Sequence, residues 1–167
     1  MSTLALIGLG ANLGNPMLAL KISLDALRQL SHDNSLEVSG LYKSAPVDAE
    51  GPDYFNAVAS LNTELSAVEL LCAMQAIENK AGRVRSYVNA PRTLDLDLLL
   101  FGDLQMRSDT LWLPHPRMHQ RAFVLRPLLD LGLAQLLIPP HGTVESLEVQ
   151  TQGQRIEKLP MNWQLIP

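Results

Sequence analysis

Two helix-start signals divide the N-terminal part of the chain into alternating strand and helix patterns. Asn15 followed by Pro16 is typical of an N-cap and a first helical position, and Ser66 with Glu69 forms a capping box. We therefore predict a helix from residue 15 to about 30 and a second helix from residue 66 to a glycine stop at 82. The first helix carries apolar residues at helical spacing at Leu18, Ile22, Leu24, Leu27 and Leu30.

Short apolar runs surround these two helices. Residues 3–9, 36–42, 55–61 and 94–101 are strand-like, and the glycines at 8 and 10 favour a turn at the end of the first run. The order strand, helix, strand, strand, helix, strand is the plan of a ferredoxin-like α+β fold, in which helices pack on an antiparallel βαββαβ sheet. We adopt this fold as the prediction.

The C-terminal part gives weaker signals. Residues 111–113 indicate a short extra strand, and residues 122–131 indicate a third helix that ends before the two prolines at 139 and 140. The pattern after residue 140 is weak. We expect residues 1–167 to form a single domain in which the residues after about 140 are a C-terminal extension, an appendage to the same core.

The composition is that of an ordinary globular protein, with 47% hydrophobic and 18% charged residues. The net charge of -4 gives no reason to expect a nucleic acid or an anionic membrane as partner. Cys72 is the only cysteine, so neither an internal disulfide nor a Cys/His zinc site can form. The start lacks the features of a secretory signal, and no apolar run approaches the ~20 residues that span a bilayer. We expect a cytoplasmic monomer.

The segment G-L-G-A-N-L-G at 8–14 follows a predicted strand and precedes a helix, as dinucleotide-binding loops do. Its third glycine falls one position late for that fingerprint, and the second strand does not end in the required acidic residue. A Walker A motif is also missing from the sequence. We interpret the glycines as a tight turn, which leaves Asn12 able to orient a neighbouring loop.

Asp95 and Asp97 form the most informative pair in the sequence. Residues two apart in a strand share a face, so both carboxylates point the same way while Leu94, Leu96 and Leu98 point into the opposite layer. Magnesium ions commonly take one or two carboxylates and complete their shell with water and phosphate oxygens. Two aspartates at a solvated strand edge are an equally good interpretation of this pattern alone.

Basic residues flank this pair on both sides. Arg83, Arg85 and Arg92 precede it with no acidic residue among them, and His115 and Arg121 follow it. Guanidinium groups beside a metal site suit phosphoryl transfer, because its catalysis consists mostly of positioning and charge neutralisation. An unspecialised surface loop and surface histidines are the alternative. The residues alone predict a nucleotide or phosphate enzyme.

Four motifs carry a resemblance to a known family. They are G-A-N-L-G at 10–14, P-D-Y-F-N-A-V at 52–58, the segment from G-R at 82–83 to R-T-L-D-L-D at 92–97, and the segment from H-P at 115–116 to R-A-F at 121–123. In this order, over residues 4 to 130, the chain resembles the 6-hydroxymethyl-7,8-dihydropterin pyrophosphokinases of folate synthesis. The string P-R-T-L-D-L-D at 91–97 is highly specific to that family.

The resemblance implies a ferredoxin-like fold and transfer of the β,γ-diphosphate of ATP to the pterin hydroxymethyl oxygen, with release of AMP. It implies that Asp95 and Asp97 bind two magnesium ions and that Arg83 and Arg92 are catalytic residues of a loop. The ATP-binding positions that it implies are Gln75, Glu78, Arg85, His115 and Arg121. The pterin-binding positions are Ser44, Val47, Tyr54, Asn56 and Phe123.

An aromatic pair with one amide suits a flat heterocycle that carries donors and acceptors. Without the resemblance, core packing would be the preferred interpretation of Tyr54 and Phe123. Val88, Asn89 and Ala90 depart from the family pattern, which usually has an arginine, a tryptophan or asparagine and a glycine there. This departure predicts a lid that seals less tightly.

Two rival functions are weighed against this one. A related enzyme could keep the ATP site and accept another alcohol. The altered stretch at 88–90 is the only feature of the sequence that suggests this alternative. A non-catalytic ferredoxin-like module could bind RNA, but the acidic charge balance and the lack of an RNP-type aromatic pattern argue against it.

Overall fold

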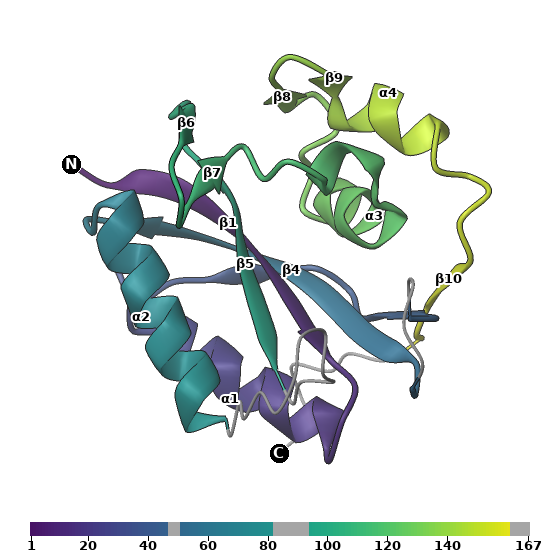
Figure 1. The fold of residues 1–167 in the computed structure, drawn as a ribbon, viewed down its shortest axis with the longest axis horizontal. Coiled ribbons are helices and arrows are strands. Elements are labelled where there is room, and N and C mark those ends of the chain that lie inside the picture. The colour runs from purple at the N-terminus through teal and green to yellow at the C-terminus, as the bar shows by residue number, and fades with distance from the viewer. Residues whose placement is uncertain (47–50, 82–93, 161–167) are drawn as a thin grey trace.

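The computed structural model of the chain describes residues 1–46, 51–81 and 94–160, and within them the main feature is a six-stranded antiparallel sheet (Figure 1). The strand order is β10, β3, β4, β1, β5, and β2 also pairs with β4. The strands are β1 (Thr3–Ala11), β2 (Glu37–Val38), β3 (Tyr42–Ser44), β4 (Tyr54–Thr63), β5 (Asp95–Phe101) and β10 (Ile156–Lys158). The order β3-β4-β1-β5, with a helix after β1 and another after β4, is that of a ferredoxin-like fold, so the predicted fold class is confirmed.

Both predicted helix starts are confirmed. Helix α1 (Pro16–Arg28) is capped by the Asn15 side chain, which accepts a hydrogen bond from the Leu18 N–H at 3.1 Å. Helix α2 (Ala67–Lys80) begins with the full capping box between Ser66 and Glu69. It ends at Lys80, and the glycine stop expected at 82 lies outside the described residues. None of the helices in the described residues is long and apolar enough to cross a membrane.

The buried face of α1 includes only some of its regularly spaced apolar residues. Leu18 and Ile22 are 49% and 57% exposed, whereas Leu20, Leu24 and Leu27 are buried in the core. The small residues Ala19 and Ser23 complete the buried stripe. Because α1 places these short side chains against the sheet, the two large residues on its flank remain in solvent.

One face of the sheet is filled by α1 and α2. Alternate residues of β1, from Ala5 through Ile7 and Leu9 to Ala11, pack there against apolar side chains of both helices. Leu96 and Leu98 of β5 join the same cluster, as expected from the period of two. The pattern breaks at a register shift between β1 and β5, after which Leu99 and Leu100 both belong to the opposite face.

The opposite face is covered in part by C-terminal elements (Figure 1). The predicted third helix is present as α3 (Ala122–Asp130), preceded by a 3₁₀ turn, η1 (Met118–Gln120). The weak sequence pattern after residue 140 concealed a further helix, α4 (Val144–Val149), whose Val144 and Leu147 are buried with α3. The C-terminal residues thus contribute to the packing of this face, while the single-domain organisation stays a prediction.

Several short strands complete the described chain. The predicted strand at 36–42 is divided into β2 and β3, and the extra strand expected at 111–113 is β7 (Trp112–Leu113). It pairs with β6 (Met106–Arg107), and β8 (Leu137–Ile138) pairs with β9 (Gly142–Thr143). The β6-β7 hairpin lies beside β5, which is the edge strand of the main sheet among the described residues. It therefore lies next to the strand that bears both aspartates.

Candidate active site

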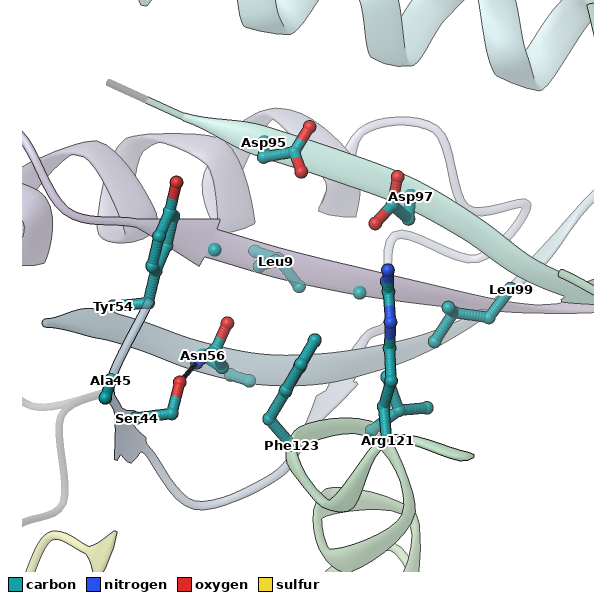
Figure 2. A pocket seen from close by; sticks show the side chains of 14 residues that line it. Leu9, Ser44, Ala45, Tyr54, Asn56, Asp95, Asp97, Leu99, Arg121 and Phe123 are labelled. Atoms are coloured by element: carbon teal, nitrogen blue, oxygen red, sulfur yellow. Dashed lines mark hydrogen bonds between the residues drawn. The ribbon is translucent and has the colours of Figure 1, made fainter. Parts of the chain in front are cut away.

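A cavity of about 190 Å³ opens on the sheet face that α1 and α2 do not cover (Figure 2). Its walls come from β1, β3, β4, β5 and the start of α3. The structure brings seven of the predicted site residues to this cavity: Ser44, Tyr54, Asn56, Asp95, Asp97, Arg121 and Phe123. Residues from distant parts of the sequence therefore meet in one place.

Two glycines of β1 form the floor of this cavity. Gly8 and Gly10 lie inside the strand, paired with Asp97 and Asp95 on one side and with Val58 and Asn56 on the other. The interpretation of both as a turn is therefore wrong, and the turn lies at Gly14, whose φ of 65° suits glycine. A Cβ atom at Gly10 would approach the Asn56 Oδ1 to 3.1 Å. The missing side chains leave the space that bulkier residues would fill.

The carboxylates of Asp95 and Asp97 face this space from β5. Both side chains are partly buried, and Figure 2 shows them on the same side of the strand, as the sequence predicted. In the described residues, no group of three or more histidine, cysteine, aspartate or glutamate side chains is arranged to hold a metal ion. The aspartate pair would therefore depend on ligand oxygens and water to complete the shell of a cation.

Arg121 projects toward the same pair from the start of α3. Figure 2 shows its guanidinium end directed at Asp97, and its Cζ atom lies 5.3 Å from the centre of the Phe123 ring. Burial lowers the pKa of Arg121 from its ordinary value, and the charge of Asp97 acts in the opposite direction. The cavity thus contains a cation that can pair with a ligand phosphate beside the two carboxylates.

Asn56 lies at the end of the cavity away from the aspartates, where its side chain is held in one orientation. It is 6% exposed, and its Nδ2 donates a hydrogen bond to the Ser44 hydroxyl at 2.8 Å. Figure 2 shows Asn56 between the rings of Tyr54 and Phe123, with its side-chain oxygen directed into the space. This end of the cavity therefore offers two aromatic surfaces and one oriented amide oxygen.

A second cavity, of about 320 Å³, lies at the edge of β5 and shares Asp97 with the first. Its other walls come from α2 and from the segment that includes β7 and His115. The lining residues that the sequence had not suggested include Leu71, Thr110 and Trp112. A local pattern could not reveal them, because they become neighbours only when the β6-β7 hairpin folds back beside β5.

His115 borders this second cavity and is tied to β5, because its backbone N–H donates to the Leu99 carbonyl at 2.8 Å. Burial, together with the positive charges of Arg121 and Arg117, lowers the pKa of His115 to about 4. The Arg117 N–H donates to His115 Nδ1 at 3.2 Å. The imidazole is accordingly neutral at pH 7 and carries its proton on Nε2, ready to donate to an acceptor.

The remaining predicted residues lie elsewhere or outside the described chain. Gln75 is exposed on α2, and Glu78 is 2% exposed and accepts a hydrogen bond from the Leu96 N–H at 2.9 Å. Val47, Arg83, Arg85 and Arg92 lie outside the described residues. Asn12 donates to the Pro52 carbonyl at 3.2 Å, so it does contact a neighbouring loop.

Comparison with known proteins gives a family. The sequence model of the 7,8-dihydro-6-hydroxymethylpterin-pyrophosphokinase (HPPK) family matches residues 6–133. The chain belongs to this family. Two bacterial relatives named 2-amino-4-hydroxy-6-hydroxymethyldihydropteridine pyrophosphokinase agree with it over nearly their whole length. The Haemophilus influenzae protein is 41% identical over 93% of this chain and 97% of its own, and the Pseudomonas aeruginosa protein is 42% identical over 92% and 95%.

The HPPK family transfers pyrophosphate to a hydroxymethyldihydropterin in folate biosynthesis, and this is the activity of the chain. The fold agrees with a solved relative. The crystal structure of Plasmodium falciparum HPPK-DHPS with pterin and p-hydroxybenzoate superposes with a TM-score of 0.71 at 15% identity, over 90% of this chain and 43% of that longer one. The cavity with the aspartate pair is thus the candidate active site of an HPPK.

Proposed function

We propose that the chain takes its pyrophosphoryl group from ATP and holds ATP and 6-hydroxymethyl-7,8-dihydropterin in the two adjoining cavities. The observation that carries this proposal is that Asp97 lines both cavities. A ligand that extends from one cavity into the other must pass this carboxylate. A triphosphate with a nucleoside at one end and the pterin at the other has that shape.

The pterin occupies the cavity between Tyr54 and Phe123. Their rings can cover the two sides of a flat bicyclic heterocycle, and Asn56 can accept a hydrogen bond from its edge. The Ser44 hydroxyl supports this contact, because it accepts one amide N–H and so fixes which way the Asn56 side chain points. The hydroxymethyl group then extends toward the aspartates.

The nucleoside occupies the second cavity, at the edge of β5. Trp112 and Leu71 give it apolar surface, and the neutral His115 can donate from Nε2 to an acceptor on the nucleotide. The nucleotide contacts of Gln75, Glu78 and Arg85 and the pterin contact of Val47 stay predictions. The catalytic roles of Arg83 and Arg92 also stay predictions.

Asp95 and Asp97 are the residues that would hold magnesium. The donor set fits that ion, because magnesium prefers oxygen ligands, and two partly buried carboxylates on one strand face leave coordination positions for phosphate oxygens and water. Two magnesium ions held by Asp95 and Asp97 would supply positive charge that reduces the charge repulsion during transfer.

The chain contributes alignment and charge, without a covalent enzyme intermediate. The pterin hydroxymethyl oxygen attacks the β-phosphorus, the bond from that phosphorus to the oxygen bridging the α-phosphate breaks, and AMP leaves. The hydroxyl proton passes to solvent. Arg121 pairs with the transferring phosphate oxygens, and its position beside Phe123 keeps it close to both substrates.

The test measures both products of the transfer, AMP and the pterin diphosphate. Purified protein is mixed with magnesium, 6-hydroxymethyl-7,8-dihydropterin and ATP labelled at the β-phosphate, with a sample containing EDTA as control. We expect equal amounts of AMP and labelled pterin diphosphate, and neither product with EDTA. Formation of ADP, or of AMP without labelled pterin, would contradict the proposal. A panel of other pterins and alcohols tests which acceptor the protein uses. We propose ATP and 6-hydroxymethyl-7,8-dihydropterin as its partners, and we propose that the protein is a cytoplasmic monomer.

A further inference from the structure

The start of α3 is held by a side chain from a distant segment. Arg121 occupies the N-cap position, and in the described residues it makes no capping hydrogen bond with its own side chain. The side chain of Gln154, in the turn after α4, makes the hydrogen bonds at the start of α3 instead. Its Oε1 accepts from the Ala122 N–H at 2.9 Å, and its Nε2 donates to the Gln120 carbonyl at 2.6 Å.

These two contacts hold both peptide groups that flank the Arg121 Cα atom. The Gln120 carbonyl belongs to the peptide plane before Arg121, and the Ala122 N–H belongs to the plane after it. Because peptide groups are planar, their relative orientation is set by the φ and ψ of Arg121, which are -111° and 114°. A single carboxamide that bonds both planes therefore fixes the direction in which the Arg121 side chain leaves the backbone.

Gln154 is itself anchored to the packed part of the molecule. Its backbone N–H donates to the Thr151 carbonyl at 2.9 Å, and the Thr151 hydroxyl donates to the Glu148 carbonyl at 2.8 Å. Thr151 is 3% exposed, and α4 is buried through Val144 and Leu147. The backbone that bears the Gln154 carboxamide is thus held in place by hydrogen bonds next to the packed helix α4.

We propose that Gln154 is a positioning residue for pyrophosphoryl transfer, which acts by orienting Arg121 toward the phosphates over Asp97. This inference rests on the proposed function, in which Arg121 contacts the ATP phosphates. It gives the C-terminal extension a part in the reaction, although Gln154 does not line the cavity. A small error in the direction of Arg121 matters, because its guanidinium must reach the phosphate from the far side of the cavity.

The test compares Gln154→Met with Gln152→Ala, a control change two residues away. Gln152 is exposed and its Nε2 donates to Glu148 at 2.8 Å, outside the start of α3. We expect Gln154→Met to lower kcat/KM for ATP by about 10- to 100-fold, since displacing a positioning group by ~1 Å can cost about 100-fold. Gln152→Ala should stay near wild type. Gln154→Glu keeps the acceptor for the Ala122 N–H and loses the donor, so it should fall between them.

A double mutant separates positioning from simple helix capping. In an Arg121→Ala background, Gln154→Met should change kcat/KM by less than about 2-fold, because the residue through which it acts is gone. The inference is overturned if Gln154→Met matches Gln152→Ala, or if its loss is equally large without Arg121. If Arg121→Ala alone keeps wild-type kcat/KM for ATP, the proposed role of Arg121 fails first, and the inference fails with it.

Discussion

The two faces of the central sheet use the same strands in opposite ways. On the α1 and α2 face, the odd-numbered residues of β1 from Ala5 to Ala11 are apolar and packed against the helices. On the other face, the even-numbered Leu6 packs on α3, but Gly8 and Gly10 leave a hollow beside Asp97 and Asp95. One strand therefore contributes stability through one set of side chains and a binding cavity through the absence of the other set.

The alternation of side chains along a strand places packing residues on one face of the sheet and the candidate site residues on the other. Asp95 and Asp97 face the hollow, while Leu96 and Leu98 between and beside them are buried with the helices. Substitutions on the helix face should therefore change the free energy of unfolding, and substitutions on the cavity face should change turnover. Substitutions on each face test this separation.

The largest effect is expected at Asp97. Asp97→Asn keeps the size of the side chain and removes the charge that we assign to magnesium binding, so kcat should fall by at least about 1000-fold. The melting temperature should stay close to wild type. AMP release and thermal unfolding are the two measurements. Asp103→Asn, an exposed change just after β5, is the control and should leave both unchanged. Near-normal AMP release by Asp97→Asn would refute the metal assignment.

The opposite result is expected on the helix face. Leu70 of α2 is fully buried in the cluster under α1 and α2. Leu70→Ala should lower the free energy of unfolding by about 2–5 kcal/mol, from lost apolar burial and the cavity that remains. Urea unfolding measures this, with Leu104→Ala, at a position that is 40% exposed, as the control. If kcat of the folded fraction fell as far as in Asp97→Asn, the two faces would not be separable.

A smaller effect is expected at the floor of the cavity. Gly10→Ala adds a Cβ atom 3.1 Å from the Asn56 Oδ1, which crowds the amide that we assign to the pterin. The KM for the pterin should rise by about 10-fold, a difference of about 1.4 kcal/mol. The KM for ATP and the melting temperature should change little, because the backbone there is an ordinary strand. Steady-state kinetics with each substrate varied in turn checks this. Equal changes in both KM values would indicate a general distortion of the site.

The same contrast explains how much the sequence could predict. Signals that depend on neighbours along the chain were sufficient, so the caps at Asn15 and Ser66 and the shared face of Asp95 and Asp97 were predicted correctly. Gly8 and Gly10 were misinterpreted, because their role depends on β4 and β5 lying on either side of β1.

Contacts between distant segments were also out of reach. Gln154 accepts a hydrogen bond from Ala122, which is 32 residues away in the sequence, and no local pattern predicts such a contact. The second cavity depends in the same way on the β6-β7 hairpin lying beside β5. The resemblance to the HPPK family supplied the identities of the predicted site residues, and the structure supplied the open floor and the adjoining cavity.

The pH dependence of stability at His115 tests whether the residues around the second cavity also carry a cost in stability. The pKa of His115 is lowered from its ordinary value of 6.5 to about 4, chiefly by burial. Between these two pH values the unfolded chain binds a proton at this residue that the folded chain does not bind. The free energy of unfolding should therefore fall as the pH is lowered from about 6.5 to about 4, with no further loss from His115 below that range. Urea unfolding of His115→Gln and wild type across this range isolates the contribution. The variant should lose less stability on acidification, and parallel curves would show that His115 is not buried in its neutral form.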